Sequence, residues 1–175
     1  LYDVFLVRTD EHGDTLWTKV YGGTGYDYGW AIKQTLNGGY IITGQTNSYT
    51  ASTDVFLLKV DENGMLEWSE TYGSNVFSSD YDSGYDVIQT TDGGYGIVGS
   101  GEIGSIQGDN LLFIKTDSLG VVEISNEYGT DGLDYGRSII ETEDGGFVLG
   151  GSTSYGFGGT SDALIIRLDA LGDTV

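Results

Sequence analysis

The chain has 175 residues and carries 27 acidic against 7 basic side chains, a formal net charge of −20. Such a charge repels a phosphate backbone and leaves no basic patch, so we expect no nucleic-acid partner. The lack of Cys excludes disulfides and thiolate metal sites, and no apolar run approaches the ~20 residues of a membrane span, so we expect no membrane insertion. Thirty Gly and 13 Tyr, with no Pro and no helical periodicity, indicate many strands joined by tight turns.

In chain order, the first predicted strands are "DVFLVRT" and "LWTKVYG", joined by the turn "DEHG". Next come "WAIKQT" and "YIITGQ" around "LNGG", then "DVFLLKV" and "LEWSETY" around "DENG". The same order returns with "YDVIQT", "YGIVGS", "NLLFIKT" and "VVEISNEY", and once more with "RSIIET", "FVLGGS" and "DALIIRL". Asp at the first and Gly at the fourth turn position suit a type I turn followed by a left-handed residue, and Asp-Gly between alternating runs is a strong hairpin signal.

The chain is therefore a tandem array of about three repeats of about 52 residues. Successive copies lie 51, 56 and 52 residues apart when they are aligned on Asp3, Asp54, Asn110 and Asp162. The pattern of each repeat predicts four antiparallel strands, which we call inner, second, third and outer. Four-stranded units of this kind are the blades of β-propellers. We expect an all-β chain that forms a single array, with blades at 1–21 (third and outer strands only), 22–72, 73–128 and 129–175 (incomplete).

Three blades are too few to close a ring, because propellers commonly have about 4 to 8 of them. The chain starts on a third strand and stops just inside an outer strand. We therefore expect a partial ring that is completed either by further blades of a longer chain or by other copies in a homo-oligomer.

The repeat resembles a known group. The pattern D-x-x-L-x-K-x-D-x-x-G-x-x-x-W-x-x-x-Y-G, then D-x-G, then T-x-D-G-G-Y-x-x-x-G, is similar to the kelch-like β-propeller repeats of large secreted and cell-surface proteins of archaea and bacteria. The departures are Asn37 in place of the turn Asp, Ile124 in place of the outer-strand Trp, and four extra residues before Asp82. The resemblance implies a propeller fold and a secreted or cell-surface location, but it implies no particular activity.

Two sets of loops are predicted to share one face of the array, namely those from outer to inner strand and those from second to third strand. They differ between copies, which marks this face as the place for function. Tyr and Phe in these loops offer flat stacking area beside hydroxyl and carboxylate groups, a combination that suits carbohydrate or protein partners. The candidate contacts are Tyr26, Tyr28, Tyr49, Phe77, Tyr81, Tyr135, Tyr155 and Phe157. The alternative is that several of them simply pack between neighbouring blades.

Acidic side chains recur before each inner strand, at Asp27, Asp82 and Asp134. Because they recur in all copies, we interpret them as caps for backbone N–H groups of the turn between blades, although a cation near the channel is the alternative. The segment "SSDYDSGYD" adds hard oxygen ligands at short spacing, which Ca²⁺ prefers. Asp80, Asp82 and Asp86 thus form a candidate calcium site, the only cofactor that the sequence suggests.

Enzyme motifs are weak. The single His, His12, occupies a hairpin turn far from the variable face, which disfavours a catalytic triad. Arg137 stands on an inner strand where the other copies carry Trp30 and Tyr85, and we expect it to pair with a neighbouring carboxylate. We therefore expect a non-catalytic recognition module that binds carbohydrate or protein. The alternatives are a structural element that forms rings, layers or filaments, and a polysaccharide hydrolase or lyase that rests only on the abundance of acids.

Overall fold

A computed structural model of the chain describes residues 2–73, 81–101, 109–130, 132–154 and 160–175, and these residues form thirteen β-strands and no helix. None of the described segments is therefore a helix long and apolar enough to cross a membrane. The strands are β1 (Val4–Thr9), β2 (Thr15–Tyr21), β3 (Asp27–Gln34), β4 (Tyr40–Thr46), β5 (Asp54–Val60), β6 (Leu66–Tyr72), β7 (Ser83–Gln89), β8 (Tyr95–Gly101), β9 (Asn110–Thr116), β10 (Val122–Tyr128), β11 (Asp134–Glu141), β12 (Phe147–Thr153) and β13 (Asp162–Leu168).

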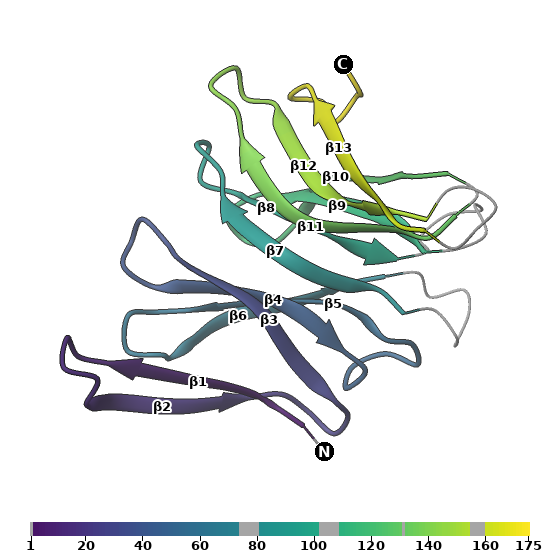
Figure 1. Cartoon of the computed structure of the whole chain (residues 1–175). Helices are drawn as coiled ribbons and strands as arrows, with labels where there is room; N and C mark the ends of the chain where they lie inside the picture. Colours follow the sequence, from purple (N-terminus) through teal and green to yellow (C-terminus); the bar gives the residue numbers. More distant parts are fainter. Residues whose placement is uncertain (1, 74–80, 102–108, 131, 155–159) are drawn as a thin grey trace.

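These strands form four antiparallel sheets in chain order, with every strand paired to the next one in its sheet. The first sheet is β1-β2, the second β3-β4-β5-β6, the third β7-β8-β9-β10 and the fourth β11-β12-β13. The sheets follow one another along an open arc (Figure 1). The prediction of an all-β chain with repeated four-stranded antiparallel sheets is confirmed, and sheets of this kind are compatible with propeller-like blades.

Both kinds of hairpin use the same turn. In the β7-β8 hairpin, Thr90 and Gly94 bond through their backbones, and Gly93 has a φ of 90°. In the β9-β10 hairpin the positive φ falls on Gly120, at 84°. Each is a type I turn closed by a left-handed Gly, so the "DGG" motif needs its first Gly for that conformation. The second Gly of the motif leaves room for the next strand, because a Cβ on Gly94 would lie 2.1 Å from the carbonyl oxygen of Thr116.

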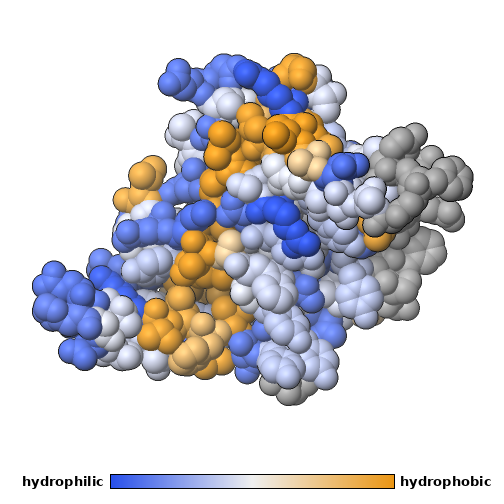
Figure 2. Space-filling view, in the orientation of Figure 1, coloured by the Kyte–Doolittle hydropathy of each residue, from blue (hydrophilic) through white to orange (hydrophobic). Residues whose placement is uncertain are grey.

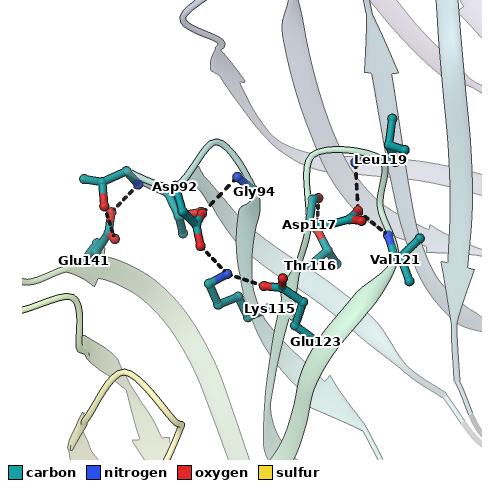
Figure 3. Close-up of polar contacts among 11 residues, drawn as sticks. Asp92, Gly94, Lys115, Thr116, Asp117, Leu119, Val121, Glu123 and Glu141 are labelled. Carbon is teal, nitrogen blue, oxygen red and sulfur yellow. Dashed lines mark hydrogen bonds and ion pairs between the residues drawn. The ribbon is translucent and has the colours of Figure 1, made fainter.

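Ion pairs fasten the two hairpins of one sheet to each other (Figure 3). Lys115 Nζ lies 2.6 Å from Asp92 Oδ2 in the first turn and also contacts Glu123 on the outer strand. Hydrogen bonds from Lys115 and Thr90 lower the pKa of Asp92 to about 2, so this carboxylate stays ionised. The basic residue that recurs on the third strand is thus part of the framework.

The core lies between consecutive sheets rather than within any one of them. Every residue of β5 is buried, because neighbouring sheets cover both of its faces. Phe56 and Leu58 pack toward Val4 of the first sheet. Leu57, which alternation places on the opposite face, packs against Ile97 of the third sheet. The continuous apolar run of a third strand therefore indicates burial on two sides.

The first and fourth sheets each have one uncovered face. Phe5 is 63% exposed although Phe56, at the equivalent position of the second sheet, is 2% exposed. Ile165 is 75% exposed, whereas its equivalent Leu57 is fully buried. Apolar residues accordingly reach the surface over β1-β2 and over β11-β13 (Figure 2).

A tyrosine latch joins the rims of consecutive sheets. Tyr21, at the end of β2, donates its hydroxyl to the carbonyl oxygen of Gly64 at 2.8 Å, and Tyr72 donates to Gly120 at 2.8 Å. A third copy of this bond, from Tyr128 to Gly172, links the third and fourth sheets. The acceptor is in each case the left-handed Gly of the next sheet's turn. The Tyr of the outer-strand "Y-G" motif therefore binds the Gly of the "D-x-x-G" turn in the next repeat.

Side chains of the inner strands make a second link between sheets. Gln89 Oε1 accepts the backbone N–H of Leu36 at 2.8 Å, which ties β7 to the turn of the second sheet. Glu141, at the end of β11, accepts both the backbone N–H and the hydroxyl of Thr91 at 2.8 Å (Figure 3). Polar bonds thus fix the relative placement of sheets that apolar contacts hold together.

The latch predicts the effect of Tyr72→Phe. The change leaves the Gly120 carbonyl without its donor, and we expect the free energy of unfolding to fall by about 1 kcal/mol, or the melting temperature by about 2–4 °C. Tyr72 is the sharper choice because burial raises the pKa of its hydroxyl well above the usual value, which marks a desolvated group. Tyr26→Phe, in an exposed loop, is the control and should leave the melting temperature unchanged; equal losses in both variants would contradict the latch.

Candidate ligand-binding site

The described parts of the two sets of variable loops lie on one face of the arc, as predicted (Figure 1). Backbone hydrogen bonds join them: Asn47 N–H donates to Tyr26 at 3.1 Å, and Asp82 N–H donates to Thr53 at 2.8 Å. Asp134 N–H donates to Asp109 at 2.7 Å in the same manner. The hairpin turns lie at the opposite ends of the strands, so the loop face is a separate surface of the molecule.

Buried carboxylates hold this face in shape. Asp27 Oδ2 accepts the backbone N–H of Gly23 at 2.8 Å and the hydroxyl of Ser48 at 2.7 Å. Asp134 Oδ2 likewise accepts the N–H of Thr130 at 2.7 Å. The predicted capping of the turn between blades is confirmed for these two residues, and Asp82, in the third copy, is fully buried.

Each inner strand contains a β-bulge directly after its "D-x-G" motif. The pairing register shifts by one residue there, so that one residue of each inner strand has no partner on the second strand. These bulged residues are Trp30, Tyr85 and Arg137. A bulge redirects a side chain and is common next to functional sites. We call these three residues the bulge row.

A pair of glycines makes room for each bulge. Gly136 on β11 faces Gly151 on β12, and a Cβ on Gly151 would lie 1.9 Å from the carbonyl oxygen of Tyr135. The second and third sheets have the same arrangement, with 1.7 Å and 1.8 Å at Gly44 and Gly99. The recurring glycines of the inner and second strands therefore serve backbone approach rather than flexibility.

The bulge row forms an aromatic surface with its neighbours. Trp30 stacks on Tyr28 with ring centroids 5.5 Å apart and planes 2° apart, and Tyr28 stacks in turn on Tyr2 at 5.6 Å. The guanidinium carbon of Arg137 lies 4.1 Å from the ring centroid of Tyr85 and 5.3 Å from that of Tyr135. Two groups of stacked flat side chains therefore lie on the inner strands, one around Trp30 and one around Arg137.

The predicted ion pair of Arg137 is wrong. Its guanidinium lies between two tyrosine rings, and it forms no ion pair and donates no hydrogen bond to any residue that the structure describes. The neighbouring acids are engaged elsewhere. Asp86 contacts Lys33 at 3.3 Å and accepts the Ile139 N–H at 3.3 Å. Asp109 accepts the Tyr135 hydroxyl, whose pKa is raised by burial and by this bond.

A hollow of about 260 Å³ opens beside the bulge row, between the loops of the second sheet and the segment before β7. We call it the aromatic hollow; it is lined by Tyr26, Tyr28, Gln45, Asn47, Thr53 and Tyr81. Gln45 Oε1 accepts the Ser83 hydroxyl at 2.5 Å and the Trp30 indole N–H at 3.4 Å. Its amide nitrogen donates to no described residue, so the hollow combines aromatic faces with an oriented amide donor.

The predicted contacts are only partly brought together. Tyr26, Tyr28 and Tyr81 line the hollow, and Tyr135 lies against Arg137. Tyr49 points elsewhere and packs on Phe56 with ring centroids 6.0 Å apart. The remaining three candidates, Phe77, Tyr155 and Phe157, lie outside the described residues.

Sequence reasoning missed the bulge row and the amides of the hollow. The sequence showed that one position of the inner strand holds a different residue in each repeat, namely Trp30, Tyr85 and Arg137. It did not indicate that a bulge turns these side chains toward one edge. Gln45 and Asn47 gave no signal, since polar residues at the end of a strand are typical of loops. The available clue was that the residue at this position changes between the repeats while the glycine before it stays the same.

The calcium hypothesis stays a prediction. Asp80 lies outside the described residues, and Asp82 is buried next to Gly101, where a Cβ would lie 2.1 Å from its Oδ1. Asp86 faces a different neighbourhood and contacts Lys33. Within the part of the chain that the structure describes, no three His, Cys, Asp or Glu residues form a group suited to a metal. Calorimetric titration with Ca²⁺ is the direct measurement.

No protein-family model matches the chain, and no curated protein matches its sequence. The geometry of the loop face is therefore the basis on which a function can be proposed.

Two adjacent glycines on β12 test the origin of the bulge. Gly151→Ala should lower the free energy of unfolding by about 1–3 kcal/mol or more, because the new Cβ collides with the Tyr135 carbonyl. Gly150→Ala is the matched control, since a Cβ there meets no atom within 4 Å and Thr43 and Val98 occupy the equivalent position. Urea denaturation of both variants provides the comparison. Similar stabilities would mean that the glycine pair is not needed for the bulge.

Proposed function

We propose that the chain is an arc of kelch-like β-propeller blades that acts as a non-catalytic recognition module, secreted or at the cell surface, and that it binds carbohydrate in the aromatic hollow. The observation that supports this most is the convergence of Tyr26, Tyr28 and Tyr81 on one hollow next to Gln45 and Asn47. Tyr26, Asn47 and Tyr81 come from loops that differ between the repeats, and Tyr28 and Gln45 come from the adjoining ends of β3 and β4. The turns on the opposite face are nearly alike.

The chemistry of the hollow suits a sugar. A sugar ring has an apolar face that stacks on an aromatic ring and hydroxyl groups that need planar donors and acceptors, which Tyr, Gln and Asn side chains provide. At about 260 Å³ the hollow is smaller than the ~300–1,000 Å³ of pockets for drug-sized ligands, and it is open at the surface. A short sugar segment at the end or side of a longer glycan fits this description better than a folded protein domain.

The placement of the basic residues favours binding over catalysis. His12 lies beside Glu11 in the exposed hairpin turn between β1 and β2, and such turns lie at the ends of the strands opposite to the loop face. Among the described residues, the only titratable groups that line the hollow are its tyrosines. A hydrolase would need a pair of carboxyl groups flanking the bound sugar.

Replacing the two most exposed tyrosines of the hollow tests the proposal. Tyr26→Ala combined with Tyr81→Ala should reduce affinity for a glycan selected on an array by about tenfold or more, because each ring loses its stacking contact. Both side chains are exposed, at 46% and 67%, so the fold should tolerate the changes. Tyr49→Ala is the control, since Tyr49 is an exposed loop tyrosine outside the hollow. A glycan array on which the intact protein binds nothing would contradict the proposal, and binding only to surface proteins would replace the sugar with a protein partner.

A second candidate function is assembly through the uncovered sheet faces. Phe5 and Val7 on the first sheet are equivalent to residues that pack against a preceding sheet, and Ile165 on the fourth sheet is equivalent to one that packs against a following sheet. The uncovered face of the fourth sheet in one copy could therefore pack on the uncovered face of the first sheet in another copy. Such an association is head-to-tail, as in rings or filaments. We expect a discrete oligomer by light scattering that Ile165→Ser dissociates. A well-folded monomer at high concentration would remove this candidate.

A further inference from the structure

Arg137 has no carboxylate partner among the residues that the structure describes, although the protein is strongly acidic. The basic residues Lys33, Lys59, Lys115 and Arg167 each lie within 3.3 Å of a carboxylate oxygen. Arg8 donates to the backbone carbonyl of Glu62, and Lys19 Nζ donates to Met65 Sδ at 3.8 Å. By contrast, none of the described residues accepts a hydrogen bond from Arg137, although 27 acidic side chains are available in the chain. All five N–H donors of its guanidinium are therefore available to a ligand.

The surroundings of Arg137 hold the guanidinium in place without neutralising it. It lies over Tyr85 of the third sheet and near Tyr135 of its own sheet, with carbon-to-centroid distances of 4.1 Å and 5.3 Å. A cation over an aromatic face is stabilised by the ring quadrupole and keeps the in-plane N–H groups free. The tyrosines thus preorganise the group, which lowers the entropic cost of binding a partner.

The fold does not require a charge at this position. The bulge after "D-x-G" is occupied by Trp30 and Tyr85 in the second and third sheets, and the glycine pair that builds the bulge is the same in all three. What the three residues share is a flat group. The charge of Arg137 is therefore an addition specific to the fourth sheet, and it needs an explanation other than stability.

We propose that Arg137 binds the carboxylate of an acidic sugar, so that the recognition surface prefers uronate-containing oligosaccharides over neutral ones. This inference rests on the proposed function and extends the site from the aromatic hollow along the bulge row. A guanidinium matches a carboxylate with two parallel hydrogen bonds. Tyr85, on β7, supports the guanidinium, and the exposed Trp30 at the equivalent bulge of β3 continues the row toward the aromatic hollow and provides a flat surface for a further sugar ring.

The overall charge limits the kind of anion that can bind. A net charge of −20 repels densely charged polymers such as nucleic acids, since no second free cation of the described residues lies on the bulge row. One carboxylate on an otherwise neutral sugar ring needs only a single guanidinium. The aromatic neighbours favour a sugar over an acidic peptide, whose flexible carboxylates gain nothing from flat stacking surfaces.

A pair of ligands that differ only in charge tests the inference. A short oligogalacturonate and its fully methyl-esterified form have the same sugar rings, and the ester lacks the carboxylate charge. We expect the intact protein to bind the acid at least about tenfold more tightly than the ester in isothermal titration at about 0.15 M salt. Hexaglutamate, measured in parallel, presents the same carboxylates without sugar.

Arg137→Tyr is the matched variant, because Tyr85 shows that the bulge accepts tyrosine. It should lose the tenfold preference for the acid and still bind the ester with unchanged affinity, and its melting temperature should stay close to that of the intact protein. Arg137→Lys keeps the charge without the bidentate geometry and should retain only part of the preference.

The outcomes separate this inference from the proposed function. Equal binding of acid and ester by the intact protein, or a preference that survives in Arg137→Tyr, would overturn the role of Arg137 and leave sugar binding in place. Binding of hexaglutamate as tight as that of the oligogalacturonate would overturn the assignment to a sugar. No binding of either oligosaccharide, together with an empty array of neutral glycans, would overturn both proposals.

Discussion

The structure depends on the burial of each sheet between its neighbours. A single four-stranded sheet of this repeat has two apolar faces, as the fully buried β5 and β9 show, and it can satisfy neither of them alone. Packing of Phe56 on one side and Leu57 on the other turns separate hairpin pairs into one array. The polar links at the rims, from tyrosine hydroxyls to turn carbonyls, add direction to this non-directional attraction. The first and fourth sheets each have a neighbour on one side only, so one apolar face of each stays uncovered.

This arrangement separates the residues that stabilise the sheets from the surface residues whose chemistry changes between repeats. The apolar strands, the hairpin turns and the capping carboxylates recur in each copy and fix the framework. The bulge built by facing glycines then presents one residue per repeat at the inner edge, and that residue is free to change from Trp30 to Tyr85 to Arg137. The loops beside it change as well. A repeat of this design can alter its surface chemistry without altering the packing between sheets, which is how one fold supports different ligands.

The candidate site was predictable in composition but not in geometry. Tyr26, Tyr28 and Tyr81 were identified because loop tyrosines on the variable face are suited to recognition, and they line one hollow. Tyr49 met the same criterion yet packs on Phe56, because the side on which a loop side chain comes to lie depends on neighbouring sheets. The partner of Arg137 was predicted wrongly, since a charge in an acidic chain suggests a carboxylate, whereas the inner strand of the neighbouring sheet places Tyr85 beneath the guanidinium.

The sequence by itself determined the all-β class, the hairpins and their turns, the order of strands in each sheet and the capping role of the carboxylates before the inner strands. These features depend on local conformation and on short-range pairing, which residue types such as Gly, Asp and alternating apolar residues encode directly. Only the tertiary structure decided which glycines face each other, where the bulges lie, which tyrosine latches onto which carbonyl and which aromatic rings come together. Those contacts join residues from different repeats or from opposite strands, so they depend on the twist and spacing of packed sheets, which no single stretch of sequence specifies.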